Sequence, residues 1–250
     1  MRGTHNTNGL SWSLERTRGE VVSLYLWCAT GAYDETPEQS GAAHFVEHML
    51  FKGTHRHAVG DVAKEVEGCG GDLNAFTSHD ETVVHATVPF EAWRETTSTL
   101  FDMVWRSTFR PEDVCAERDV ILEEIASYRD DPHSVLEDAS SALLFGAHPY
   151  GRPVIGHHET VAALTHEQLL AFWRANHRPS RCHLAIAGPL DHNDVARWLS
   201  AHVPPCVAPA DEGSEAAMPP RTGHRIHLEE DFDTQLALLS WRGPPSSHPD

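Results

Sequence analysis

The sequence predicts an α+β fold, in which helices pack on a mainly antiparallel sheet. Segments with the alternating or continuously apolar character of strands occur beside longer segments whose apolar residues recur with the helical period. The two kinds of segment do not alternate regularly along the chain, and adjacent strand-like segments suggest hairpins. This arrangement favours an α+β layer structure over a doubly wound parallel sheet.

Five segments carry strand signals. Residues 10–16 alternate apolar and polar side chains, whereas residues 21–30 form a continuous apolar run that is typical of a buried strand. Residues 72–78 and 81–89 are strand-like and closely spaced, which predicts a hairpin. Residues 182–188 form a further short apolar segment of the same kind.

Seven segments have the period of helices. Gly53 lies just past the end of the first, Pro111 stands in the first turn of the fourth, and Pro132 ends that helix. The predicted helices cover residues 40–51, 59–71, 90–107, 111–131, 133–147, 159–177 and 191–203.

The composition of the chain changes after the last of these helices. Residues 204–223 are rich in proline, alanine and glutamate without any period, which predicts a linker. Two segments that resemble fresh strands follow, at 224–230 and 233–243. We therefore expect one complete domain at residues 1–203 and the start of a second domain at residues 224–250, which suits a chain of 250 residues.

Composition excludes several functional classes. The 37 acidic and 19 basic side chains give a formal net charge of −18, which argues against nucleic-acid binding. We expect no membrane span and a cytoplasmic location, or a periplasmic one if an upstream export signal has been removed. The five cysteines are scattered and form no CxxC pair, so we expect reduced structural cysteines rather than a disulfide framework or a thiolate zinc site.

His44, Glu47 and His48 form a candidate catalytic triplet. The two histidines are four residues apart on a predicted helix, so both imidazoles can reach one ion. Glu47 adjoins the same face and could take a proton from a metal-bound water. In a chain with 19 histidines this pattern arises by chance in roughly one case in ten. The alternative is two surface histidines on an amphipathic helix.

A second predicted helix offers a third ligand. At 100° per residue, Glu124 lies about 20° from Glu117, whereas Glu123 lies about 120° away. Glu117 and Glu124 therefore share a face, and one of them could complete a two-histidine, one-carboxylate site while the other orients ligands or water. The alternative is that all three glutamates lie in solvent, as most helix glutamates do.

Five strings in order resemble the pitrilysin/insulinase family of inverted-motif zinc peptidases. The match spans residues 8 to 250 and is closest to two-half members, such as the β subunit of mitochondrial processing peptidase and its bacterial relatives. That family places its glutamate ligand some seventy-odd residues after the second histidine, and Glu124 follows His48 by 76. The strings are GAAHFVEHMLFKGT (41–54), GGDLNAFTSHDET (70–82), ERDVILEEI (117–125), HPYGRPVIG (148–156) and FWRANHRPSRCHLAIAGPL (172–190).

The resemblance implies a zinc-dependent endopeptidase that hydrolyses peptides or unfolded polypeptide segments. Carried over by position, it implies that one Zn²⁺ per chain is bound by His44, His48 and Glu124, with Glu47 as the general base and Glu117 as a supporting carboxylate. The family's α+β unit normally occurs twice, in a pseudo-symmetric pair that encloses a chamber. Most of the second half is missing here, so we expect a missing C-terminal half or a partner chain to complete the chamber.

The resemblance also implies where substrate binds. Asn74, Ala75, Phe76 and Thr77 match a strand edge that pairs with an extended peptide. The alternative is that Phe76 belongs to the core and Asn74 to a turn. Two other functions stay open, namely a non-catalytic peptide-binding or assembly subunit and a metal site that is only structural.

Overall fold

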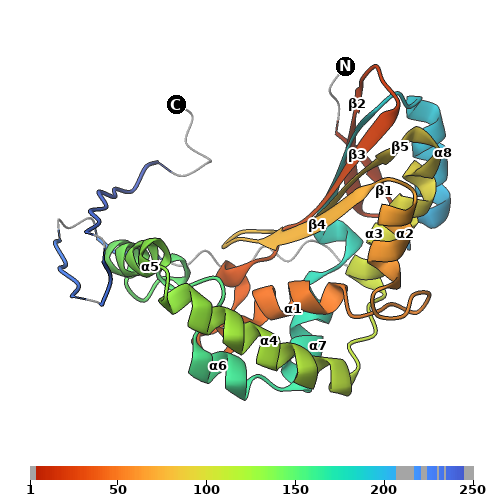
Figure 1. The fold of residues 1–250 in the computed structure, drawn as a ribbon. Helices are drawn as coiled ribbons and strands as arrows, with labels where there is room; N and C mark the ends of the chain where they lie inside the picture. The colour runs from red at the N-terminus through yellow and green to blue at the C-terminus, as the bar shows by residue number, and fades with distance from the viewer. Residues whose placement is uncertain (1–3, 207–216, 221–223, 230, 234, 245–250) are drawn as a thin grey trace.

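The computed structural model describes residues 4–206, 217–220, 224–229, 231–233 and 235–244. Six strands within residues 4–206 form one sheet in the order β1-β2-β6-β3-β5-β4. Every pair is antiparallel except β2 and β6, which run parallel, so the predicted α+β fold with a mainly antiparallel sheet is confirmed (Figure 1). The strands are β1 (His5–Thr7), β2 (Leu10–Arg16), β3 (Val21–Cys28), β4 (Asp72–Thr77), β5 (Thr82–Pro89) and β6 (Cys182–Gly188).

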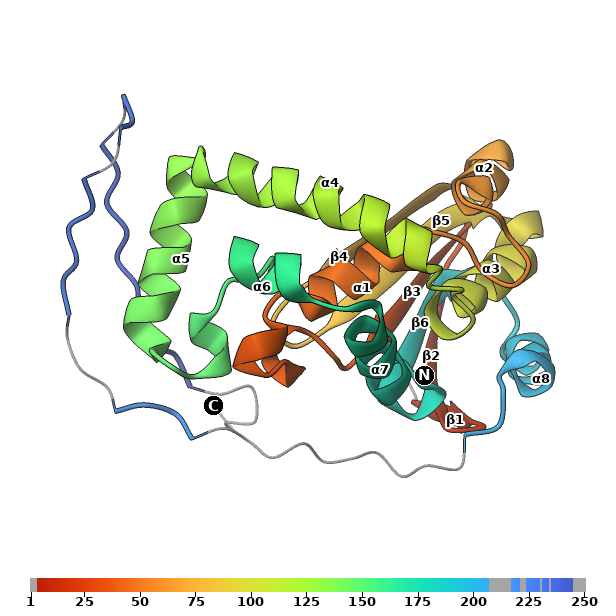
Figure 2. The same ribbon diagram turned by 90° about the horizontal axis from the view of Figure 1, so that it is seen from below.

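Eight α-helices accompany the sheet in the described part of the chain. Figure 2 shows α1, α6 and α7 in front of the sheet, with α4 alongside them. The helices are α1 (Ala42–Leu50), α2 (Asp61–Gly68), α3 (Trp93–Trp105), α4 (Pro111–Arg129), α5 (Pro132–Phe145), α6 (His158–Ala163), α7 (His166–Asn176) and α8 (His192–His202). Short 3-10 helices are η1 (Ala32–Asp34), η2 (Pro37–Gln39), η3 (Phe90–Ala92), η4 (Pro149–Gly151) and η5 (Pro179–Arg181). None of the helices among the described residues has the length and apolarity needed to cross a membrane.

Alternation along the central strands separates the two faces of the sheet. Val22, Leu24 and Leu26 of β3 are fully buried, whereas Tyr25 and Trp27 at the alternate positions remain partly exposed. Successive side chains of a strand point to opposite faces, so the helices cover one face and leave the other more open. Helix α3 packs on β3 and β5, while α1 and α2 pack on β4.

The single helix predicted over residues 159–177 is wrong, because the chain forms α6 and α7 with a break between them. The backbone of Leu164 leaves the helical conformation, with φ −57° and ψ 127°. Thr165 then caps α7: its hydroxyl accepts from the backbone N–H of Gln168, and the Gln168 side chain accepts from the N–H of Thr165. This reciprocal capping box starts a new helix where the apolar period alone predicts continuation.

The two strands predicted at 224–230 and 233–243 are not formed in the described residues of those segments. Leu239 and Trp241 are 86% and 80% exposed there. A strand needs a neighbour for its backbone hydrogen bonds and an apolar surface for its side chains, and the described part of the chain supplies neither here. Glu230, Thr234 and residues 207–216 and 221–223 lie outside the described residues, and the division into domain, linker and second domain stays a prediction.

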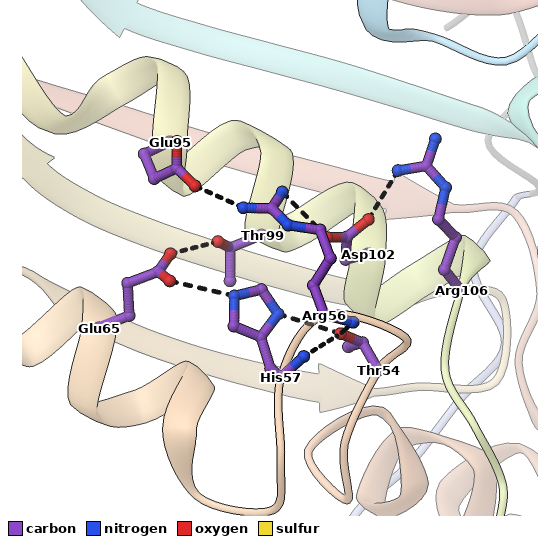
Figure 3. A network of polar contacts seen from close by, with 8 residues as sticks. All are labelled: Thr54, Arg56, His57, Glu65, Glu95, Thr99, Asp102 and Arg106. Atoms are coloured by element: carbon purple, nitrogen blue, oxygen red, sulfur yellow. Dashed lines mark hydrogen bonds and ion pairs between the residues drawn. The ribbon is translucent and has the colours of Figure 1, made fainter.

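A polar network fixes the segment that leaves α1 (Figure 3). Asp102 of α3 is fully buried and forms salt bridges with Arg56 at 3.1 Å and Arg106 at 2.6 Å. On the neighbouring side, the His57 ring bonds to Thr54 and Glu65 at 3.0 Å each. Since one side of the network comes from the α1–α2 connection and the other from α2 and α3, it holds α1 in place relative to the sheet.

Candidate metal centre

The backbone at the start of helix α1 is tightly packed against a neighbouring segment. Gly41 has φ +96°, and a Cβ there would lie 2.8 Å from the carbonyl oxygen of Ile155. The buried carboxyl group of Glu35, whose pKa is raised by burial to about 8, accepts from the backbone N–H groups of Gly41 at 3.1 Å and Ala43 at 2.8 Å. These donors are otherwise unpaired at a helix N-terminus, so Glu35 anchors the turn that carries His44. Sequence reasoning missed Glu35, for which the only signal is an acidic residue shortly before the helix.

The structure brings together the three predicted ligands. His44 Nε2 and His48 Nε2 lie 3.9 Å and 3.5 Å from Glu124 Oε2, and one ligand atom from each residue lies within 4.8 Å of the other two. Ligand atoms around a tetrahedral zinc with bonds of about 2.0–2.1 Å are roughly 3.3 Å apart. Small side-chain adjustments would therefore let this donor set hold one ion. It is the only such group of three or more candidate ligands in the described residues.

Glu117 lies behind His48, as the shared helix face predicts. His48 Nδ1 and Glu117 Oε1 are 2.8 Å apart, and Lys52 Nζ is 2.5 Å from Glu117 Oε2. Burial alone would raise the pKa of Glu117, but the bonds with His48 and Lys52 outweigh it and lower that pKa. The carboxylate thus accepts from Nδ1–H and leaves Nε2 of His48 directed towards Glu124. Lys52 was missed by sequence reasoning, although it stands one helical turn after His48.

The pKa values of the two histidines shift in opposite directions. Burial, with the neighbouring His48, lowers the pKa of His44 to about 4, so His44 is neutral at pH 7 and ready to bind a metal. Burial also disfavours the charged form of His48, but the bond to Glu117 and the nearby carboxylates together raise its pKa. Protonation therefore competes with metal binding more strongly at His48 than at His44.

Glu47 stands beside the cluster and is tied to β4. Its Oε2 accepts from the hydroxyl of Thr77 at 2.7 Å. Burial raises the pKa of Glu47, while the hydrogen bond from Thr77 opposes the shift. A carboxylate with a raised pKa is suited to both accepting and returning a proton near neutrality. Thr77, predicted to contact substrate, therefore contacts the predicted general base.

Strand β4 lies at one end of the sheet and packs against α1. Within the described residues no further strand pairs with its outer edge. The side chain of Asn74 is exposed and its Oδ1 accepts from the N–H of Ala75. Phe76 is 42% exposed, so it does not belong to the core. The backbone edge at Asn74, Ala75 and Phe76 is thus accessible beside the metal cluster.

Comparison with known proteins identifies the family of the chain. Residues 12–158 match the family described as insulinase (peptidase family M16), and residues 163–250 match the one described as peptidase M16 inactive domain. The chain is 38% identical over 206 residues to an uncharacterized zinc protease of Mycobacterium leprae, covering 82% of this chain and 46% of that one. It is 37% identical over 200 residues to an uncharacterized zinc protease of Streptomyces coelicolor, covering 80% and 43%. The chain therefore spans about half the length of the curated relatives it matches.

Solved structures show the same fold. The periplasmic protease PqqL from Escherichia coli aligns with a TM-score of 0.76 at 28% identity, over 87% of this chain and 25% of that one. A protease from Helicobacter pylori gives a TM-score of 0.80 at 22% identity, over 88% and 53%, and this likeness concerns the fold alone. The specific closeness to the β subunit of mitochondrial processing peptidase stays a prediction. The chain belongs to the insulinase family of M16 peptidases.

Proposed function

We propose that this chain is the zinc-binding catalytic unit of an endopeptidase that hydrolyses peptides or unfolded polypeptide segments. One observation carries the proposal: His44 and His48 of α1 and Glu124 of α4 converge within 4.8 Å, with Glu47 beside them. The relatives named zinc proteases support the same assignment. A purely structural metal site would give no task to the half-buried Glu47.

Each of the side chains around the site has a separate role in the proposed reaction. A bound zinc ion would act as a Lewis acid and lower the pKa of its water towards neutrality. His44, His48 and Glu124 would hold the ion, and Glu117 would keep His48 in the tautomer that presents Nε2. Glu47 would accept a proton from the attacking water and return it to the leaving amine. Thr77, bonded to one oxygen of Glu47, orients the carboxylate and leaves the other oxygen for proton transfer.

The edge of β4 would bind the substrate. An extended peptide that adds to this edge pairs through backbone groups, which reads sequence weakly. Asn74 and Phe76, both exposed, would contact side chains of that peptide. We further infer that a second half, covalent or supplied by a partner chain, closes the site, since the chain spans about half of its relatives.

Metal analysis and peptide cleavage test the proposal together. Elemental analysis should give one zinc per chain, Glu124→Gln should lose it, and the matched control Glu123→Gln on the same helix should keep it. Glu47→Gln should retain zinc and cleave a quenched peptide about 10²–10⁴-fold more slowly. The cleavage assay is run with the second half restored. Retention of full zinc affinity by Glu124→Gln would contradict the assigned site.

A second candidate is a non-catalytic peptide-binding subunit. It is favoured by the match of residues 163–250 to the domain described as inactive. The candidate metal ligands all lie in the other matched segment, residues 12–158, which favours catalysis. Peptide binding without cleavage, unaffected by Glu47→Gln in the restored protein, would favour the second candidate.

A further inference from the structure

Two buried cysteines lie opposite each other on the neighbouring central strands β3 and β6. Cys28 ends β3 and Cys182 begins β6, and the two are direct partners in the antiparallel register. Cys28 is completely buried and Cys182 is 4% exposed. Their sulfur atoms lie 3.3 Å apart. By contrast, Cys69 and Cys115 are exposed.

The backbone places this pair at a position that a disulfide can span. Just beyond Cys28 and Cys182, which are the last pair of the ladder, the N–H of Ala29 donates to the carbonyl oxygen of Arg181 at 2.8 Å. Hydrogen-bonded and non-hydrogen-bonded pairs alternate in an antiparallel ladder, so Cys28 and Cys182 occupy a non-hydrogen-bonded position, where Cα atoms are about 4.5 Å apart. Disulfides span Cα separations of about 4.4–6.8 Å. Rotation of the two side chains would bring the sulfurs to about 2.05 Å without moving the strands.

Cys182, which is 4% exposed, is the member of the pair that a small molecule can approach, from the end of the strands. Cys28 and Cys182 contribute to the wall of an open cavity of about 420 Å³, together with Trp27, Ser180 and Arg181. The hydrogen bond with Cys182 and burial raise the pKa of Cys28, against the opposing influence of the Arg181 charge. Little thiolate of Cys28 therefore forms at neutral pH, so the attack by Cys28 should be slow there and faster in mild alkali.

We propose that Cys28 and Cys182 form a reversible redox site that low-molecular-weight disulfides oxidise to a cross-strand disulfide. The thiolate of Cys182 attacks one sulfur of the small disulfide, forming a mixed disulfide and releasing one small thiolate. The thiolate of Cys28 then attacks the Cys182 sulfur, forming the protein disulfide and releasing the second small thiolate. The two protein protons end on the two released thiols, so two electrons pass from the protein to the small disulfide.

The bond would join β3 near the start of the domain to β6 near its end. The loop that it closes contains α1 and α4, and closing so long a loop restricts the unfolded chain strongly. The redox site shares no residue with the metal centre, so the inference is independent of the proposed peptidase activity. Its expected effect is on stability.

Peptide mapping of the complete chain tests the proposal. The protein is incubated with oxidised glutathione at pH 8, denatured in N-ethylmaleimide, digested without reductant and analysed by mass spectrometry. We expect one cross-linked peptide pair containing Cys28 and Cys182. The melting temperature of this form should exceed that of the dithiothreitol-reduced protein by about 5 °C or more. Cys28→Ser should abolish both effects, and the matched control Cys69→Ser should preserve both.

Three outcomes would overturn the proposal. Both thiols could remain fully alkylated after oxidation, glutathione could be found only on the exposed Cys69 and Cys115, or the cross-linked form could melt no higher than the reduced form. Mapping and melting of the unsubstituted chain decide the matter even if Cys28→Ser does not fold.

Discussion

Lys52 shows how a single side chain outside the ligand set can tune the metal centre. It neutralises Glu117, which in turn fixes the ring of His48. We expect Lys52→Met to lower zinc affinity about tenfold, because a partner behind a metal-binding histidine typically contributes a factor of 10–100. Competition with a chromogenic chelator measures the change. Lys64→Met, which removes a lysine that is 77% exposed, is the matched control, and equal affinities of the two variants would refute the role of Lys52.

His177 predicts a pH dependence of stability that is separate from the metal centre. Burial, with the charge of Arg181, lowers the pKa of His177 to about 3, although a hydrogen bond with the backbone of Trp173 opposes the shift. The unfolded chain, with an ordinary pKa near 6.5, binds the proton first. The stability that neutral His177 contributes is therefore complete well above pH 6.5 and is lost progressively as pH falls towards 3.

The size of this dependence can be measured. Between pH 7 and pH 5 we expect His177 to account for a loss of about 2 kcal/mol in the unfolding free energy of the zinc-free chain. Urea unfolding at both pH values should show this loss reduced in His177→Phe and unchanged in His158→Phe, whose histidine is exposed. An equal pH dependence of the unfolding free energy in the unsubstituted chain and in both variants would show that folding does not lower the pKa of His177.

At the scale of elements, the start of α1 depends on two glycines in contact. A Cβ on Gly156 would lie 2.6 Å from the Cα of Gly41, and φ at Gly156 is +81°. We expect Gly156→Ala to lower the unfolding free energy by about 3 kcal/mol or more, since it adds a clash between backbone segments to the strain of a positive φ. Zinc affinity should fall with it, because the turn that carries His44 must move.

Gly60 provides the matched control for this substitution. Its φ is +82°, and a Cβ there would meet no atom within 4 Å. Gly60→Ala therefore carries the strain alone and should cost about 1 kcal/mol. Thermal unfolding of both variants separates the two effects. Equal losses would mean that the close approach of Gly41 and Gly156 does not constrain α1.

The elements also show which features the sequence could predict. The helical period alone predicts α1 and α4. Together with the family resemblance, the residue spacing also predicts that His44 and His48 of one helix face Glu117 and Glu124 of the other. The capping box at Thr165 is local and was nonetheless missed, because the apolar period runs through it. Strand β1 has three residues, too few for an alternation pattern. The parallel pairing of β2 with β6 joins distant segments, and only the folded chain reveals it.

At the scale of the whole molecule, the folded domain and the described segment after it differ in how far their apolar side chains are buried. Residues 4–206 bury a continuous core, whereas the described residues after them keep large apolar side chains exposed, among them Leu239 and Trp241. The contacts of that segment with the domain include a hydroxyl pair, Ser140 and Ser240, at 2.7 Å and the approach of Arg242 to Phe145 at 6.0 Å. An apolar segment held so weakly is suited to bury its side chains against another folded unit.

Removing residues 207–250 tests this separation. We expect the shortened chain to keep its melting temperature within a few degrees and to bind zinc with the same stoichiometry, because the core and the metal centre lie within residues 4–206. Self-association in analytical ultracentrifugation should fall relative to the complete chain, and the double variant Leu239→Ser/Trp241→Ser should reproduce that fall without any deletion. A shortened chain that unfolds or loses zinc would instead make the segment part of the catalytic domain, and the predicted boundary at residue 203 would be wrong.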